Sequence, residues 1–154
     1  MKILISTFII VTISFIAKAQ NTFQKFYDAG ADAECFGAYQ LADGGYLFTG
    51  IINSGNYKVF MARTDCDGDV VWCRAFNNSS TVGNISQRAI PTYDGGFVLA
   101  ASVGSFNAYN ILIAKTDGSG NVIWQKIMQG TGDDLVNSII ETSKHDLVIA
   151  GKTN

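Results

Sequence analysis

Short apolar stretches separated by polar turns recur along this chain about every 12 residues. They are rich in Val, Ile, Phe, Tyr and Thr, and no stretch shows sustained helical periodicity. This spacing is typical of four-stranded antiparallel meanders, and it predicts two sets of four strands. They are expected at residues 34–41, 45–52, 57–64 and 70–76, and again at 85–92, 96–103, 109–116 and 121–128.

Two sequence motifs of the first set of strands recur in the second set. Residues 63–72 (RTDCDGDVVW) return 52 positions later as residues 115–124 (KTDGSGNVIW). Residues 43–48 (DGGYLF) return 51 positions later as residues 94–99 (DGGFVL), and their apolar part returns again at 147–149. A period of about 50 residues with four short strands per unit is typical of propellers and similar β-arrays. The sequence therefore predicts an all-β fold of tandem, four-stranded, propeller-like blades.

The register of the repeat divides the chain into about two and a half blades, too few to close a ring, which takes at least about four. The third unit shows its first two strands, at 135–142 and 146–152. Residues 23–26 (FQKF) align with residues 124–127 (WQKI), which predicts an orphan last strand of another unit. The expected domain is residues 20–154, with the orphan strand at 22–28, unit one at 33–76, unit two at 84–128 and partial unit three at 133–154.

The first 19 residues have the pattern of a secretory signal peptide. Lys2 precedes an apolar run from Ile3 to Ile16, and residues 17–19 (AKA) form a cleavage site. A membrane anchor would need about 18 or more apolar residues, and this run is shorter. We therefore expect cleavage after Ala19, no membrane contact afterwards, and a location outside the cell, at its surface or in a periplasm.

Composition narrows the classes of partner. Without Lys2 and Lys18, nine of the 11 basic residues remain against 13 acidic residues, and no Lys/Arg cluster is present. This balance argues against nucleic acid as a partner. Sparse charge with abundant glycine and aromatic residues is instead typical of tightly turned β-structure whose strands are buried on both faces. The third strand of each unit, with apolar residues throughout 59–62 and 111–114, is expected to lie between neighbouring sheets.

The turns between the first two strands of each unit have a specific chemistry. Residues 43–45 and 94–96 are both Asp-Gly-Gly, and glycine permits the positive φ that such hairpin turns require. The third unit has Lys144-His145-Asp146 instead. Its hairpin must therefore use another type of turn or a strained one.

Three cysteines are an odd number for an exported chain. Ser86, Gly118 and Gln125 stand at the equivalents of Cys35, Cys66 and Cys73, so the repeat does not require thiols. A bridge between Cys66 and Cys73 is conceivable, but one lies in a turn and the other well along the next strand. That placement argues against the Cα separation below about 7 Å that a disulfide needs.

Carboxylates and aromatic residues supply the candidate binding groups. Asp65, Asp67 and Asp69 offer oxygen ligands for Ca²⁺, but the equivalent residues 117–121 keep one carboxylate and the same turn, which favours an Asx-type turn. Trp72 and Trp124 could stack on a sugar, although one fixed position in each repeat favours packing between blades. The candidates for ligand contact near the variable second loop are Tyr57, Phe106 and Tyr109.

Nothing in the sequence forms a catalytic constellation, so we predict neither catalytic residues nor a metal or cofactor. His145 is the only histidine and lies in a turn, and no G-x-S-x-G or H-E-x-x-H motif occurs. Asp133-Asp134 could act in acid–base chemistry, but its place before a first strand favours a solvated linker. An enzyme with an active site in a propeller pocket is the least favoured hypothesis.

The pattern K-T-D-x-x-G-x-x-x-W-x-K at residues 115–126, preceded by D-G-G-F-V-L-A at 94–100, resembles the β-propeller-type repeats of large secreted proteins of the Bacteroidota. Those proteins often end in a sorting domain for type IX secretion. The pattern is also similar to the tryptophan-docking motif of quinoprotein propellers, in which the Trp packs between adjacent blades. The spacing differs from the quinoprotein and sialidase-like patterns, so the resemblance implies architecture and no enzymatic activity.

Two functional hypotheses remain open at this point. The first is a secreted, non-enzymatic repeat protein that binds another protein or a surface polymer, or serves as a structural module. The second is a truncated fragment of a larger propeller without independent function. Either way, both end blades would expose apolar faces and strand edges, which predicts self-association.

Overall fold

The computed structural model describes residues 24–28, 30–53, 57–76, 84–105 and 107–153, with residues 84–87 described by their backbone alone. The predicted signal peptide, residues 1–19, lies outside this part of the chain, as does Phe106. The described residues form ten strands in three antiparallel sheets. They include no helix long and apolar enough to cross a membrane.

Each sheet follows the chain order, as expected for a meander. The first sheet contains β1 (Asp32–Gln40), β2 (Tyr46–Asn53), β3 (Tyr57–Thr64) and β4 (Val70–Phe76). The second contains β5 (Asn84–Pro91), β6 (Phe97–Ser105), β7 (Ala108–Thr116) and β8 (Val122–Met128). The third consists of β9 (Leu135–Glu141) and β10 (Leu147–Lys152). The predicted all-β fold of two four-stranded blades and a two-stranded third is confirmed, with strand bounds that differ from the expected ones by at most two residues.

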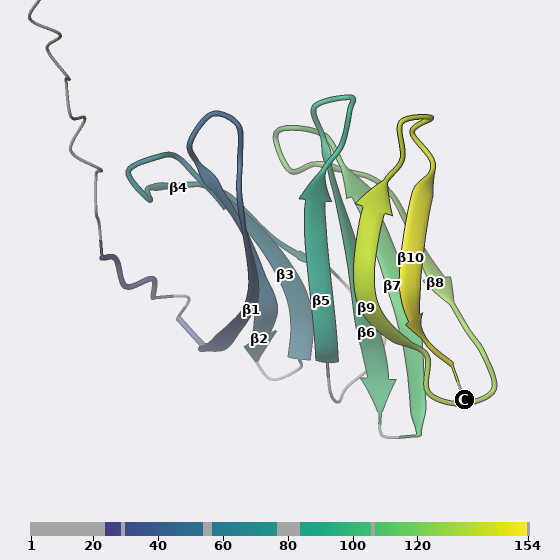
Figure 1. Cartoon of the computed structure of the whole chain (residues 1–154). Coiled ribbons are helices and arrows are strands. Elements are labelled where there is room, and N and C mark those ends of the chain that lie inside the picture. Colours follow the sequence, from purple (N-terminus) through teal and green to yellow (C-terminus); the bar gives the residue numbers. More distant parts are fainter. Residues whose placement is uncertain (1–23, 29, 54–56, 77–83, 106, 154) are drawn as a thin grey trace, which may run out of the picture.

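The three sheets stand side by side, stacked face to face, and do not close into a ring (Figure 1). Their first strands β1, β5 and β9 contact one another in succession along one side of the stack. The fourth strands β4 and β8 form the opposite edges of their sheets. This arrangement places the same strand of each repeat in the same position relative to the next sheet.

Strand β6 is the centre of the packing because it is buried on both faces. Phe97, Leu99, Ala101 and Val103 join the core between the first and second sheets. The alternate residues Val98 and Ala100 join the smaller core between the second and third sheets. Side chains alternate between faces along a strand, so one continuous apolar segment serves two cores.

The third strands meet the sequence expectation to different degrees. In β7, Leu112, Ile113 and Ala114 are buried. In β3, Val59 and Met61 are fully buried, whereas the alternate Phe60 and Ala62 are only half-buried. The prediction of burial on both faces is thus confirmed for β7 and wrong for β3, because no described sheet covers the outer face of the first sheet.

The third hairpin adopts the strained form of the turn that the glycines make elsewhere. In all three turns the backbone hydrogen bonds run in the same pattern; in the third, Thr142 N donates to Asp146 O and His145 N donates to Thr142 O. Gly44 and Gly95 occupy the left-handed position with φ of 87° and 78°, and His145 takes it with φ of 65°. A side chain at this φ costs about 1–2 kcal/mol, so packing elsewhere holds the turn.

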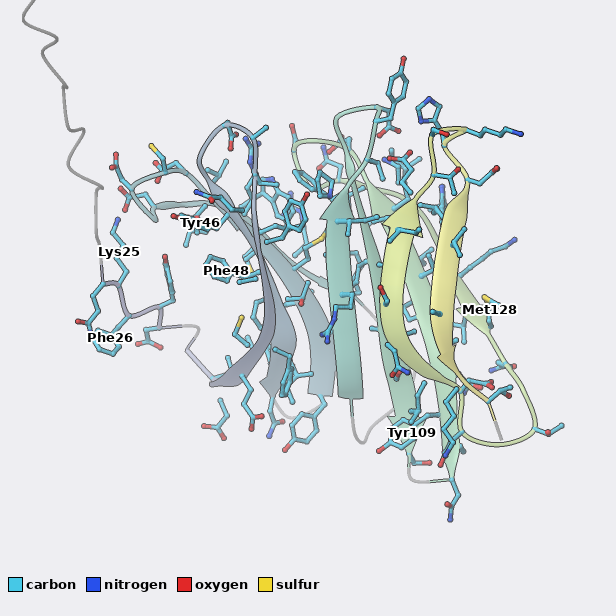
Figure 2. All side chains as sticks on the ribbon, in the orientation of Figure 1. Lys25, Phe26, Tyr46, Phe48, Tyr109 and Met128 are labelled. Atoms are coloured by element: carbon cyan, nitrogen blue, oxygen red, sulfur yellow. The ribbon has the colours of Figure 1, made fainter. Side chains whose placement is uncertain are left out.

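The expected orphan strand at 22–28 is not formed in its described part, residues 24–28, which has no strand pairing. Side chains hold this segment instead. Lys25 Nζ lies 2.5 Å from Asp69 Oδ1, and the Tyr27 hydroxyl donates to the carbonyl oxygen of Gly68 at 2.7 Å. The segment therefore still lies beside the first sheet, at one margin of the molecule, with Phe26 exposed (Figure 2).

Candidate functional site

Trp72 is at the interface between the first two sheets and is 8% exposed. Its ring meets Phe97 of β6 edge-on, with the centroids 5.5 Å apart. Its indole Nε1 donates to the carbonyl oxygen of Gly118 at 3.2 Å. Gly118 belongs to the turn of residues 117–121 in the next sheet, so the Trp of one repeat binds the turn of the following repeat, and the predicted packing role of Trp72 is confirmed.

Two arginines extend this contact on either side of Trp72. Arg74 Nε donates to the carbonyl oxygen of Gly120 at 3.1 Å. Arg63 Nη1 lies 3.5 Å from the carbonyl oxygen of Gly118, while its Nη2 donates to Asp43 Oδ2 at 2.5 Å. Turn 117–121 is therefore held by three donors that all come from the first sheet.

The backbone explains why the two tryptophans hold equivalent positions. In each four-stranded sheet the pairing of the last two strands shifts by one residue: Trp72 pairs with Arg63 and Trp124 pairs with Lys115. From that irregularity onward, alternate residues of the last strand face the next sheet. Trp72 and Phe76 thereby face the second sheet, and Trp124 and Met128 face the third.

The second copy of this interface is open. Trp124 is 40% exposed and Met128 is 52% exposed, against 8% and 1% for their equivalents Trp72 and Phe76. Met128 lies at the margin of the molecule beside β10 (Figure 2). The expected packing role of Trp124 is therefore wrong for the described chain, because the third sheet consists of β9 and β10 and offers no counterpart of β7 or of turn 117–121.

We call this exposed surface the open face. It comprises the exposed Trp124, Lys126 and Met128 of β8, together with the half-buried Ile111 of β7 and Leu147 and Ile149 of β10. Two cavities lie along it. One, of about 270 Å³, is lined by Trp124 and Leu147 among others; the second, of about 360 Å³, is lined by Ile111, Met128 and Ile149 among others.

The smaller cavity has a polar and aromatic rim formed by the first turns of units two and three. Tyr93 stacks on His145 with ring centroids 3.9 Å apart, and Tyr93 N donates to Glu141 Oε2 at 2.7 Å. His145 Nδ1 lies 3.7 Å from Glu141 Oε1. The lone histidine thus helps join the second and third sheets at the cavity that Trp124 also lines.

An ion pair also lines the same cavity. Lys115 Nζ donates to Asp94 Oδ1 at 2.8 Å and to the carbonyl oxygen of Thr116 at 3.1 Å. This bond to Lys115, together with donors from Thr92 and Gly96, holds the pKa of the Asp94 carboxyl well below its ordinary value. Asp94 is therefore an ionised acceptor at neutral pH and not a general acid.

Asp65 and Asp117 serve the backbone of their own turns. Asp65 Oδ1 accepts hydrogen bonds from the amides of Asp67 and Asp69, and Asp117 Oδ1 accepts them from Ser119 and Asn121. The Asx-type interpretation of both turns is confirmed. Among the described residues, no group of three or more His, Cys, Asp or Glu is placed to hold a metal ion.

The expectation of a solvated linker at Asp133-Asp134 is wrong. Asp134 is buried and its amide donates to the carbonyl oxygen of Tyr109, while Asp133 Oδ1 accepts from the amide of Tyr109 at 3.2 Å. These bonds tie the linker to β7. The Tyr109 side chain is buried, so of the two described candidates for ligand contact, Tyr57 and Tyr109, Tyr57 is the one at the surface.

Cys35, Cys66 and Cys73 are all free, so the conceivable Cys66–Cys73 bridge is not formed. Burial raises the pKa of the Cys73 thiol, and the positive charge of Arg74 only partly opposes that rise. A raised pKa favours the protonated thiol, which is the unreactive form. Nothing in this environment activates Cys73 as a nucleophile.

Sequence reasoning did not find Tyr93, Lys115 or Glu141 as parts of a site. Lys115 was detectable in principle, since it stands where Arg63 stands in the preceding repeat. Tyr93 and Glu141 carried no such signal, because their contact joins residues 48 positions apart.

No model of a known protein family matches this sequence, and the comparison with curated proteins finds no match.

Proposed function

We propose that this chain is a secreted, non-enzymatic binding module whose open face engages another polypeptide. The observation that carries the proposal is the contrast between two equivalent tryptophans. Trp72 is covered by a polypeptide turn, whereas the same frame around Trp124 is exposed. A surface that has one polypeptide-filled copy in the same molecule is best suited to a polypeptide ligand.

The chemistry of the open face supports this assignment. Trp124, Met128 and Ile111 provide apolar area, and aromatic residues and methionine are enriched in the cores of protein interfaces. Glu141, His145 and Lys115 surround one end with polar groups. An apolar centre with a polar margin is the usual anatomy of an interface.

Export and membership among Bacteroidota-type propeller repeats are part of the proposal. They are supported by the N-terminal pattern of residues 1–19 and by the K-T-D-x-x-G-x-x-x-W repeat. They are consistent with each other, because the resembled repeats belong to secreted proteins.

The test is the association state of residues 20–154, measured by size-exclusion chromatography with light scattering. We expect copies to form a discrete oligomer through the open face, and the double variant Trp124→Ser, Met128→Ser to be monomeric. Ile127→Ser, on the other side of β8, is the matched control and should leave the oligomer intact. A wild-type chain that stays monomeric would contradict the proposal, and polydisperse aggregate would favour a fragment of a larger propeller.

A further inference from the structure

The free edge of β10 borders the open face. Within the described chain β10 pairs only with β9, so its other edge presents unpaired backbone groups. In the second sheet the equivalent strand β6 uses that edge to pair with β7, from Phe97–Thr116 through Ser105–Ala108. An unpaired edge without proline is a template for an added strand.

Strands β6 and β10 follow the same type of turn, so their residues can be compared position by position. Thr92 and Gly96 bond across the turn before β6 as Thr142 and Asp146 do before β10. Leu147 therefore corresponds to Phe97. Phe97 contacts Trp72 in the interface between the first two sheets, and Leu147 lines a cavity with Trp124 on the open face.

The elements that cover Trp72, Val59 and Phe76 between the first two sheets show what could cover the open face. These three residues lie in one core with Phe97 and Leu99 of β6 and Leu112 and Ala114 of β7, and turn 117–121 follows β7 directly. The open face has the counterpart of β6, which is β10, and has no described counterpart of β7 or of the turn. The first interface thus has a cover of one strand followed by one turn, which the described residues do not provide for the open face.

We infer that the open face binds a β-hairpin of another polypeptide, whose first strand pairs with β10 and whose Asp-x-x-Gly turn covers Trp124. The inference rests on the proposed function, since it specifies the polypeptide that the open face engages. Backbone hydrogen bonds to β10 supply affinity, and the turn supplies selectivity. A glycine is required where the turn meets the indole, because a Cβ on Gly120 would stand 2.7 Å from Trp72 Cδ2.

The chain itself provides a probe. A fluorescent peptide with the sequence of residues 108–128 contains β7, turn 117–121 and β8. Added to the intact residues 20–154, it should bind saturably by fluorescence anisotropy. The Trp124→Ala protein should bind it at least about tenfold more weakly, as expected for a tryptophan at the centre of an interface, and the Ile127→Ala protein should bind it normally.

The peptide variant Gly120→Val should bind weakly to the unaltered protein, because its turn cannot approach the indole. Hydrogen exchange provides the second measurement: bound peptide should slow exchange of amides in residues 147–152. Binding that is insensitive to Trp124→Ala, or that leaves these amides unprotected, would overturn the inference. If the peptide fails to bind while the chain still forms Trp124-dependent oligomers, the hairpin is wrong and the proposed function stands.

Discussion

The indole of Trp72 lies directly against Gly120, at a distance that leaves no room for a Cβ on the glycine. Gly120 also has a φ of 79°, which side chains rarely adopt. The two residues belong to successive copies of one motif, so the Trp and the Gly of K-T-D-x-x-G-x-x-x-W are opposite sides of one interface. The motif therefore joins successive repeats, and within the described residues Trp124 has no equivalent turn against its indole.

Replacing this glycine should cost more than its backbone conformation alone. Gly95 has a nearly identical φ of 78° with open space around it, so Gly95→Ala should lower the free energy of unfolding by about 1–2 kcal/mol. Gly120→Ala should lose that amount and more, because Trp72 must move. Urea unfolding of both variants measures the difference, and equal losses would contradict the contact between Trp72 and Gly120.

The two tryptophans should differ in their contribution to stability. Truncating a buried Trp costs about 3–5 kcal/mol, and Trp72→Ala should fall in this range because the ring is buried and its Nε1 is bonded. Trp124→Ala should lower the unfolding free energy by less than half as much. Chemical denaturation of both variants, at concentrations where the chain is monomeric, checks this. A similar cost at the two positions would mean that Trp124 is covered.

The ion pair between Asp94 and Lys115 should make the stability of the fold depend on pH. Lys115 lowers the pKa of Asp94 in the folded state, so the pair stabilises the fold above the unfolded pKa of about 3.9. That contribution is lost as the pH falls from about 4 toward the lowered folded pKa. The Asp94→Asn protein should therefore lose less stability than the wild type as the pH falls below about 5. Thermal unfolding at a series of pH values measures this loss. Asp67→Asn, in an exposed turn, should leave the profile unchanged; a flattened profile there, or an unchanged one in Asp94→Asn, would refute this role.

Export should leave a defined N-terminus. If residues 1–19 are a signal peptide, expression with the leader intact should yield a protein that begins at Gln20. Mass spectrometry of the exported fraction measures it. A substitution of Ala19 by a large residue such as Ala19→Phe should block processing, and retention of Lys2 in the exported protein would show that the segment is not removed.

The repeat predicted the strands well because each depends on its own pattern and turn chemistry. Apolar alternation and the Asp-Gly-Gly turns locate β2 and β6 to within two residues, and the lack of glycine in the third turn predicts the strained conformation of His145. Long-range pairing was the part that local pattern could not supply. The linker at Asp133-Asp134 looked solvated because its partner, the backbone of Tyr109, lies 24 residues away.

At the candidate site, too, the local sequence predicted the strands but not the contacts between sheets. Equal spacing in the sequence made Trp72 and Trp124 look alike, but burial is decided by the next sheet, and the third sheet differs from the second. For the described residues 24–26, the alignment with a fourth strand predicted their position and not their conformation. Lys25 and Tyr27 contact turn 65–69 much as Arg74 contacts turn 117–121, yet the segment forms no strand.

Acrylamide quenching of single-tryptophan proteins measures the contrast between the two interfaces most directly. Trp124→Phe leaves Trp72 as the only indole, and Trp72→Phe leaves Trp124. We expect Trp72 fluorescence to be strongly shielded from acrylamide and Trp124 fluorescence to be readily quenched in the monomeric chain. Trp124 should become shielded when the peptide of residues 108–128 is added. In this peptide the Trp is replaced by Phe, so that it does not contribute fluorescence. Equal quenching of the two indoles in the folded monomer would contradict this expectation.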